Sequence, residues 1–368
     1  MFITIIVFIL ILGLLVFVHE FGHFYAAKKA GMDVEEFGIG FPPKMYSKKY
    51  KGTEYSLNLI PLGGFVKIKG EDEEIEGDED SFSNKPIWRR LSVIVAGVTM
   101  NALTGWFLLS ALFLFGAPVE ITPDIDEKYI KEKNIVIAEV IQDSPAAIAG
   151  LLAGDKILKV ENNFLDNIES FQLAMEASKD EETEITYKRG ETESVVSITP
   201  KIIENIQPDR AIIGIAPTEI GIVKFPIHKA IVAGAQSGYN YSKRILEVLG
   251  NIFKDVWNRQ PVAQSVGGPV AVAVITGDML DMGFSHLIIF IAVLSLNFAV
   301  INIMPFPALD GGRLIFLIAE KIRGKPSRQV IEAWFHRVGF LLLMLLMIVV
   351  TYRDIARFGG RIWHAVVG

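Results

Sequence analysis

Four long apolar segments divide the chain, and each comes near the length that a helix needs to cross a membrane. They are Phe2 to Val18, Leu91 to Phe115, Leu287 to Met304 and Val338 to Thr351. A hydrocarbon core of about 30 Å requires roughly 20 predominantly apolar residues in a helix. The first segment has no lysine or arginine before it and no small-residue cleavage site after it, so we expect a retained helix rather than a signal peptide. The pattern predicts a polytopic α-helical membrane protein with four transmembrane helices.

Other regions have different patterns. Residues 135–200 contain short β-like runs around one helical run, FQLAMEAS, which predicts an α+β module between the second and third apolar segments. Residues 218–282 mix apolar and charged positions at helical spacing, which suits helices lying on a membrane surface better than a span. After the PLGG sequence, the run VKIK at 66–69 alternates with a period of two, which indicates a strand with one apolar face.

Composition supports a membrane protein and narrows the chemistry. Apolar residues make up 51% of the chain, which is high for a soluble protein. The chain has no cysteine, so disulfides, thiolate zinc sites and cysteine nucleophiles are excluded, and any metal must be held by His, Asp or Glu. Much of the net charge of −6 comes from the acidic run Glu71 to Asp80, which we expect to be a solvated linker. Neither charge nor aromatic pattern suggests nucleic acid as a partner.

Lysines and arginines gather in two of the segments that join the apolar runs, between the first and second and between the third and fourth. The positive-inside rule places both segments in the cytoplasm. The amino terminus, residues 116–283 and the carboxyl terminus are then expected on the other side. Arg353, Arg357 and Arg361 beyond the last apolar run count against the placement of the carboxyl terminus.

The sequence HEFGH, near the end of the first apolar segment, fits the pattern H-E-x-x-H. One helical turn separates His19 from His23, so both imidazoles point from one face toward a single metal ion. Glu20 beside them can take a proton from zinc-bound water. An unpaired ionisable residue at membrane depth costs about 2.5 to 3.5 kcal/mol, which favours a functional role. The alternative is that these residues only mark the interfacial end of the helix.

A catalytic zinc usually has three protein ligands and one open position, so a third ligand is required. Asp33, Glu35 and Glu36 follow the motif closely and are candidates. We prefer Asp310, the only acidic residue of NFAVINIMPFPALDGGR, because opposed topology brings the ends of the first and third segments to the same level. The alternative is that Asp310 is an exposed turn residue in a loop leaving the membrane.

Two prolines explain how such a ligand could be presented without a regular helix around it. Pro305 and Pro307 each remove a backbone donor and disfavour helix in the preceding residue, so the chain is expected to extend just before Asp310. Gly311 and Gly312 then allow close approach of the backbone. Irregular backbone at that depth is tolerated only where it is buried in protein or lines a wet cavity.

The two motifs together resemble the site-2 protease family of intramembrane zinc metalloproteases, and the bacterial RseP-type branch in particular. HEFGH lies in the first span and NIMPFPALDGG at the end of a late one. The stretch Gly52 to Glu71 also resembles the membrane-associated β-hairpin of that branch, and residues 135–200, with AGLLAGDKILKV, resemble a PDZ domain. The resemblance covers essentially the whole chain. It departs from the family at Val98, where relatives usually have proline, and at Arg313, where histidine is common.

The resemblance implies a role for individual residues. His19, His23 and Asp310 would be the zinc ligands, with Glu20 as general base. Asn302 would steady the substrate or the developing oxyanion by donating a hydrogen bond, although a helix–helix hydrogen bond is an equal alternative. An edge strand beside the cavity could pair with an unwound substrate, and its candidate residues are Gly63, Gly64, Phe65 and Val66. The alternative is a hairpin that only packs the loop.

The predicted organisation follows from these patterns. The segments are 1–25 (transmembrane helix 1 with H-E-x-x-H), 26–90 (cytoplasmic loop with hairpin and acidic linker), 91–115 (transmembrane helix 2), 120–217 (PDZ-like domain), 218–282 (amphipathic peripheral helices), 283–313 (transmembrane helix 3), 314–333 (cytoplasmic loop), 334–352 (transmembrane helix 4) and 353–368 (carboxyl-terminal tail).

The resemblance implies a zinc endopeptidase in the lipid bilayer of the bacterial inner (cytoplasmic) membrane, with the PDZ-like domain outside the cytoplasm. Its expected substrates are membrane proteins with a single transmembrane helix, such as an anti-sigma factor already cut on its outer side, or remnant signal peptides. The PDZ-like domain would bind peptide termini by strand addition, or serve only as a folded spacer. The main alternative is a membrane-tethered PDZ adaptor with a structural or vestigial metal site. A zinc-handling transporter is a second, although four spans with one open-ended ligand set make a poor conduction path.

Overall fold

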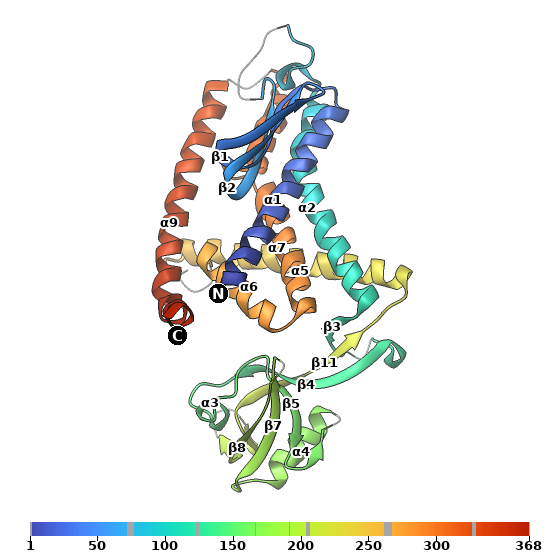
Figure 1. Cartoon of the computed structure of the whole chain (residues 1–368), viewed down its shortest axis with the longest axis vertical. Coiled ribbons are helices and arrows are strands. Elements are labelled where there is room, and N and C mark those ends of the chain that lie inside the picture. Colours follow the sequence, from blue (N-terminus) through green and yellow to red (C-terminus); the bar gives the residue numbers. More distant parts are fainter. Residues whose placement is uncertain are drawn as a thin grey trace. The chain divides into compact units, whose positions relative to one another are not determined.

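The computed structural model describes residues 2–71, 77–122, 125–165, 167–190, 192–203, 207–260, 267–325 and 329–367. Part of the predicted acidic linker, residues 72–76, lies outside this range. Contacts divide the chain into two compact units (Figure 1). The helical unit comprises Met1–Leu109, Gly234–Leu280 and Ile288–Gly368, and the β unit comprises Ser110–Ala233 and Asp281–Leu287.

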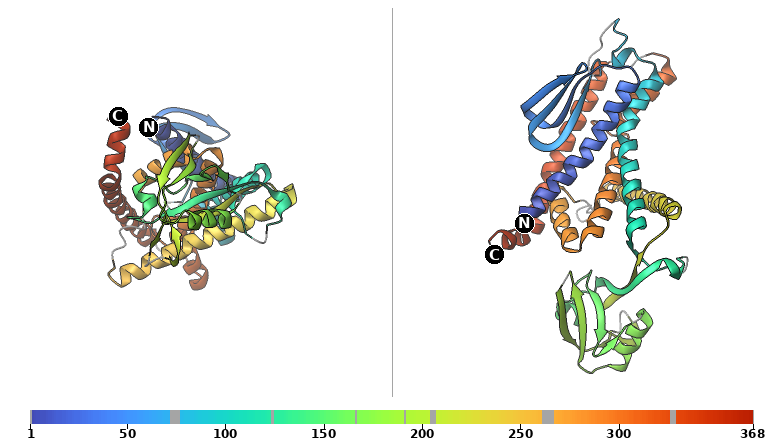
Figure 2. Two further views of the ribbon diagram at one scale, coloured as in Figure 1. Left: turned by 90° about the horizontal axis from the view of Figure 1, so that it is seen from below. Right: turned by 45° about the vertical axis from the view of Figure 1, so that its right-hand side comes forward.

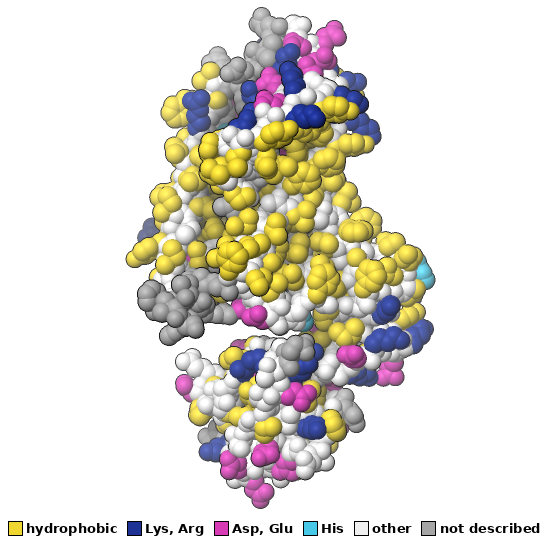
Figure 3. All heavy atoms as spheres, viewed as in Figure 1, with side chains coloured by type: hydrophobic (Ala, Val, Ile, Leu, Met, Phe, Trp, Pro, Cys, Tyr) yellow, Lys and Arg dark blue, Asp and Glu magenta, His cyan; other side chains and the backbone are white. Residues whose placement is uncertain are grey.

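Long helices make up most of the helical unit. They are α1 (Phe2–Lys29), α2 (Ile87–Phe115), α5 (Ile227–Trp257), α6 (Pro269–Asp281), α7 (Phe284–Ile303), α8 (Asp310–Arg323) and α9 (Gln329–Val367). Within the described residues, four helices are long and apolar enough to cross a membrane: α1, α2, α7 and the section Val330–Gly360 of α9. Apolar side chains cover the face of this unit seen in Figure 3, and large exposed apolar patches are rare on soluble monomers. The chain is a multi-pass membrane protein.

The helix boundaries in the last third of the chain differ from those expected from the sequence. The third span ends at Ile303 rather than 313, and most of the predicted loop 314–333 is helical because α8 occupies Asp310–Arg323. Gly324 ends α8 in the left-handed conformation, at φ 64°, where its N–H bonds to the carbonyl of Glu320. The fourth helix continues through the predicted tail to Val367. Both ends of α9 carry polar residues, so the hydropathy pattern predicted only its apolar middle part.

Small residues bring α1 and α2 together. A Cβ added to Gly22 would lie 2.5 Å from the carbonyl oxygen of Ala96, a separation that real side chains do not adopt. The hydroxyl of Ser295 on α7 donates to the backbone carbonyl of Asn101 on α2 at 2.8 Å. Glycine lets helix backbones approach closely in lipid, where packing and interhelical hydrogen bonds replace the hydrophobic effect as the source of association. Despite Val98 in place of the family's proline, α2 is one continuous helix.

A β-hairpin lies along α1 (Figure 2). Its strands are β1 (Val34–Tyr50) and β2 (Thr53–Ile68), which pair antiparallel around a turn at Lys51–Gly52. The first half of β1 pairs on both sides: Phe37 lies opposite Val66 and also opposite Tyr55. Thus β2 folds back, and its two halves flank the start of β1. The hairpin is longer than the segment Gly52 to Glu71 that the sequence suggested, because the preceding residues form its other strand.

The β unit is built on one antiparallel sheet of seven strands. Its order is β3-β11-β4-β5-β7-β8, with β6 paired to β5. The strands are β3 (Ala117–Glu120), β4 (Ile130–Val140), β5 (Lys156–Val160), β6 (Asn163–Phe164), β7 (Thr183–Arg189), β8 (Thr192–Ile198) and β11 (Ile215–Val223), beside the pair β9 (Lys201–Ile203) and β10 (Gln207–Ile212) and the helices α3 (Pro145–Ile148) and α4 (Ile168–Ala177). The single longer helix, α4, covers the helical run predicted there.

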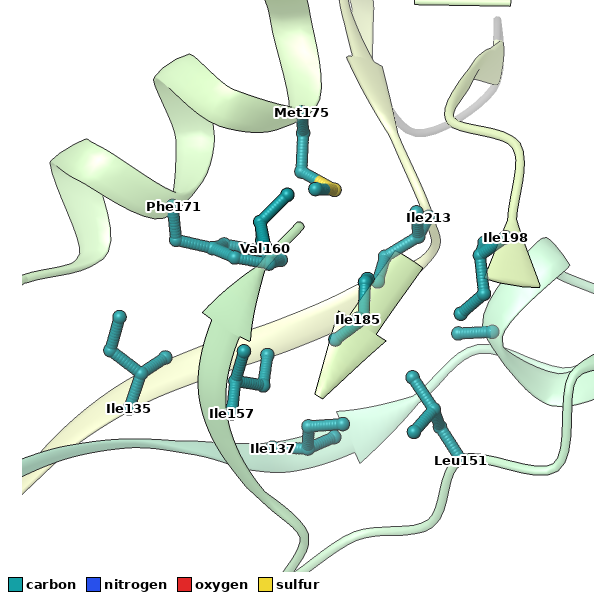
Figure 4. Close-up of a cluster of buried hydrophobic side chains, with 11 residues drawn as sticks. Ile135, Ile137, Leu151, Ile157, Val160, Phe171, Met175, Ile185, Ile198 and Ile213 are labelled. Carbon is teal, nitrogen blue, oxygen red and sulfur yellow. The ribbon is translucent and has the colours of Figure 1, made fainter. Parts of the chain in front are cut away.

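The core of the β unit lies between this helix and the sheet. Phe171 and Met175 from α4 face Val160 and Ile185 from the strands (Figure 4). Ile185 is fully buried, at 0% exposure. The capping box between Asn167 and Ser170 fixes the start of α4, so its apolar face is held over the sheet. The β unit therefore has a hydrophobic core of its own.

Asp354 joins α9 to the beginning of α6. Its buried carboxylate accepts hydrogen bonds from the backbone N–H groups of Gly268 and Ala271, both at 2.9 Å. The first N–H groups of a helix have no acceptor within the helix itself, and negative charge is favoured at that end. A Cβ on Gly268 would lie 2.7 Å from Val350, so α9 passes too close for any other residue there.

Removing this cap should destabilise the helical unit. We predict that Asp354→Ala lowers the stability of detergent-purified protein by about 1–3 kcal/mol, because two buried donors lose a charged acceptor. Asp354→Asn keeps an oxygen acceptor and should lose less. Arg357→Ala, on an exposed position of the same helix, is the control and should change nothing. Thermal unfolding followed by fluorescence measures the effect; equal midpoints for Asp354→Ala and the wild type would contradict the role assigned to the cap.

Candidate metal centre

Three side chains far apart in sequence converge within the helical unit. His19 and His23 project from α1, and Asp310 is the first residue of α8. Nε2 of His19 lies 3.2 Å from Oδ2 of Asp310, Nε2 of His23 lies 3.3 Å from the same oxygen, and the two Nε2 atoms are 3.2 Å apart. Among the residues that the structure describes, this is the group of His, Asp and Glu that could hold a metal ion.

The separations of these three atoms fit zinc. A tetrahedral zinc ion with ligand bonds of about 2.0–2.1 Å holds its ligand atoms about 3.3 Å from one another. The three atoms therefore match one face of such a tetrahedron, which leaves its fourth corner for water or substrate. Oδ2 of Asp310 is buried and accepts no hydrogen bond from a described residue. A buried carboxylate oxygen in that condition is costly unless a cation neutralises it, so the donor set fits a divalent metal.

The ring of His23 is held in the form that can bind a metal. Its Nδ1 lies 2.9 Å from the backbone carbonyl of Val93 on α2. A carbonyl only accepts, so Nδ1 carries the proton and the lone pair of the neutral ring is on Nε2. Hydrogen bonds of this kind orient metal-binding histidines in many proteins.

His19 has its partner about two turns further along α2, eight residues after Val93. Its Nδ1 lies 3.4 Å from the side-chain amide of Asn101, which is fully buried, and the other end of that amide, Oδ1, has no partner among the described residues. The two ends of an amide are nearly equal in size. If the Asn101 amide is rotated by 180°, its Oδ1 faces His19 and accepts a hydrogen bond from the Nδ1–H of that ring. Oδ1 of Asn101 then has a partner, and Nε2 of His19 keeps the lone pair that can bind a metal.

Gly97 makes room for both imidazoles. A Cβ at this position would lie 2.3 Å from Nε2 of His23 and 2.8 Å from Cε1 of His19. Any larger residue would therefore push the ligand atoms out of place. Gly97 and Asn101 were not singled out as site residues from the sequence. Their spacing of four, which places both on one face of a helix, was the available signal.

A cavity of about 540 Å³ opens beside the three converging atoms. Glu20 lines it together with His19, His23 and Asp310, as do Phe65 and Val66 of β2. Gly64 packs beside the Glu20 side chain, at 3.6 Å from the position of its missing Cβ to Cγ of Glu20. One wall thus carries carboxylate and imidazole groups, and another carries the backbone of a strand.

The remaining predicted site residues are not part of the three-atom cluster, although Glu35 lines the same cavity. Glu35 pairs with Lys67 at 2.7 Å and Glu36 with Lys44 at 3.0 Å, so these nearby acids bind lysines instead of joining the two histidines. Asp33 is 4.0 Å from Lys69. Asn302 is in the last turn of α7 and is not among the described residues that line the cavity. Gly63, in β2, packs against Phe41. Arg313 does line the cavity, where its guanidinium contacts the carboxylate of Glu71.

A membrane protein with this donor set has the features of a zinc-dependent hydrolase, and comparison with known families gives its class. The chain matches the model of Peptidase family M50 over residues 7–346. It belongs to that family, the site-2 proteases, so the family predicted from the two motifs is confirmed.

Individual relatives agree with this assignment. The chain is 29% identical to the regulator of sigma-W protease RasP of Bacillus subtilis, over 96% of this chain and 98% of that one. It is 30% identical to the zinc metalloprotease RasP of Geobacillus kaustophilus, with the same coverage, and 30% identical to that of Shouchella clausii, over 96% and 99%. Among solved structures, the PDZ domain of an SdrC-like protein from Listeria monocytogenes matches 27% of this chain and 93% of its own, at 25% identity and a TM-score of 0.21. The chain is a zinc-dependent metalloendopeptidase, as predicted.

Variants of Asn101 test the hydrogen bond to His19. We predict that Asn101→Leu raises the zinc dissociation constant about 10–100-fold, because the imidazole loses the group that fixes its tautomer. Asn101→Asp can only accept a hydrogen bond and should retain near wild-type affinity. Competition against a zinc-chelating dye, with thermal unfolding as a folding control, measures both. If the folded Asp variant binds zinc as poorly as the Leu variant, the amide nitrogen is the group that matters, and the tautomer given above is wrong.

Proposed function

We propose that this protein hydrolyses peptide bonds in or near the transmembrane helices of other membrane proteins, with zinc bound by His19, His23 and Asp310. The observation that carries the proposal is the mutual separation of the three ligand atoms, 3.2–3.3 Å, in a set of helices apolar enough to cross a membrane. A metal site among membrane-spanning helices is accessible to the transmembrane segments of substrates, which soluble proteases do not reach.

The protein's own groups would divide the chemistry as follows. Zinc, when bound, supplies Lewis acidity that polarises a carbonyl and makes water more acidic. Glu20, on the cavity wall beside the ligands, takes a proton from the attacking water as its oxygen bonds to the scissile carbonyl carbon. The same carboxyl then gives the proton to the leaving amine when the carbon–nitrogen bond breaks. Asn302 keeps the role that the family pattern implies, donation of a hydrogen bond to substrate or oxyanion, as a prediction.

The strand that lines the cavity supports a way of presenting the substrate. A protease needs an extended backbone, so a transmembrane helix must unwind before it is cut. In β2, residues 64–68 pair with β1 along one edge, and no strand pairs with the other edge among the described residues. An unwound substrate segment could add to that edge as a further strand, with Phe65 and Val66 beside the catalytic groups.

The charge pattern supports an orientation. Lysines and arginines concentrate in residues 26–90 and 314–333, which the positive-inside rule assigns to the cytoplasm. The β unit would then lie outside the cytoplasm of a bacterial inner membrane. We propose that its PDZ-like module, within residues 120–217, docks peptide termini of substrates trimmed on that side, and that these substrates include membrane-bound regulators and remnant signal peptides.

Glu20→Gln separates hydrolysis from metal binding. The variant should keep one zinc per chain but lose about 10²–10⁴-fold in cleavage rate, because the amide cannot accept the proton. The assay is cleavage of a model single-span substrate by purified protein in detergent, with a chelator-treated sample as the zinc-free control. Undiminished cleavage by Glu20→Gln would sink the assignment. A biological effect that survives in this variant would instead favour a tethered adaptor.

Val66→Pro tests presentation by the strand. Proline removes the backbone N–H, which reaches the Glu20 carboxylate at the strand edge, so it disturbs the general base as well as the edge offered to a substrate. Cleavage should slow at least about tenfold, equivalent to roughly 1.4 kcal/mol. Zinc content should not change. Val66→Ala shortens the side chain but keeps the backbone donor, so it is the matched control and should cleave near the wild-type rate. If both variants cleave at the same rate, the strand backbone does not hold the substrate.

A further inference from the structure

The chain makes a tight turn just before Asp310. The N–H of Leu309 donates to the carbonyl of Phe306 at 3.3 Å, which closes a four-residue turn with Pro307 second and Ala308 third. Ala308 has a φ of +70°. Proline in the second position and a positive φ in the third are the marks of a type II β-turn.

An alanine in the third position makes this turn unfavourable by itself. That position normally holds glycine, because a Cβ crowds the backbone when φ is positive. A type I turn has the same ends and accepts alanine without strain. The two turns differ in the orientation of the central peptide, here the bond between Pro307 and Ala308. Some other contact must therefore favour the observed orientation.

His336 supplies that contact from α9. The N–H of Ala308, which belongs to the central peptide, donates to Nδ1 of His336 at 3.0 Å. In a type I turn this N–H would point to the other side and lose its acceptor. The imidazole thus selects one of the two turns, and Asp310 follows the selected peptide by only two residues.

Close packing holds α9 against the turn. A Cβ on Gly339 would lie 2.0 Å from Cβ of Pro307, so glycine is required where the helix crosses the turn. Gly312 is similarly placed, with its missing Cβ 3.3 Å from Cε1 of His336. Asp354, 18 residues or about 27 Å further along α9, bonds to the start of α6. The helix that carries His336 is therefore anchored at two separate points.

We propose that His336 is a positioning residue for the metal centre: it fixes the Pro307–Ala308 peptide so that Asp310 meets His19 and His23. The inference rests on the zinc site of the proposed function and gives the fourth membrane helix a part in it. None of the four residues of the turn binds the metal. Their conformation determines the position of Asp310, the third ligand.

Zinc affinity of the full-length protein in detergent tests this role. His336→Ala should raise the zinc dissociation constant at least about tenfold, in the range seen when outer contacts of metal ligands are removed. His336→Asn should bind nearly as well as wild type, because Oδ1 of asparagine takes the place of Nδ1. In His336→Gln the amide lies one bond further out, so this variant should resemble the Ala variant.

A second substitution separates the turn from general stability. Glycine at position 308 adopts a positive φ without strain, because it has no Cβ. The double variant Ala308→Gly/His336→Ala should therefore recover most of the zinc affinity lost in His336→Ala. Trp334→Ala, at an exposed position of the same helix, should leave zinc binding unchanged. Cleavage rates should follow zinc affinity across the series and converge at saturating zinc.

Two results would overturn the inference: wild-type zinc affinity in His336→Ala, or failure of both the Asn variant and the Ala308→Gly double variant to recover it. Thermal unfolding of each variant without zinc identifies any that is merely unfolded. The proposed function can fail separately. If the wild type binds one zinc but cuts no membrane substrate, proteolysis is wrong, while the affinity series still decides the role of His336.

Discussion

The whole molecule depends on one electrostatic constraint: two imidazoles and a carboxylate approach to 3.2–3.3 Å within a set of apolar helices. When both imidazoles carry their proton on Nδ1 and no cation is bound, the buried Asp310 oxygen has no hydrogen-bond donor among the described residues. The surroundings are arranged to keep the cluster together. Gly97 gives it space, Val93 and Asn101 orient the imidazoles, and the turn before Asp310 delivers the carboxylate.

Each transmembrane helix then has a distinct task around the site. The first carries His19, Glu20 and His23, and the second orients the two imidazoles through its backbone and Asn101. The third ends where the proline-rich turn begins, and the fourth braces that turn through His336 and Gly339. Beside them, residues 64–68 of β2 line the cavity, along an edge where no further strand pairs among the described residues.

The sequence predicted the parts with a local signature and missed those that depend on contacts between helices. Spans and the H-E-x-x-H spacing follow from short-range periodicity, and the choice of Asp310 over Asp33, Glu35 and Glu36 followed from topology. Four contributors were not visible: β1, helix α8, Asn101 and His336. β1 has exposed residues on both faces of its outer half, so it shows no alternation. α8 lies beyond the third apolar run and carries charged residues, so the sequence pattern assigns its residues to the end of that span and to a cytoplasmic loop. Asn101 and His336 matter only through partners 82 and 28 residues away.

The most direct measurement of the central claim is anomalous X-ray scattering at the zinc absorption edge from crystals of the purified protein. We predict one strong peak per chain, about 2.0–2.2 Å from Nε2 of His19, Nε2 of His23 and a carboxylate oxygen of Asp310. A zinc-containing crystal whose peak lies away from these three residues, or whose Asp310 is turned out of reach of both histidines, would contradict it.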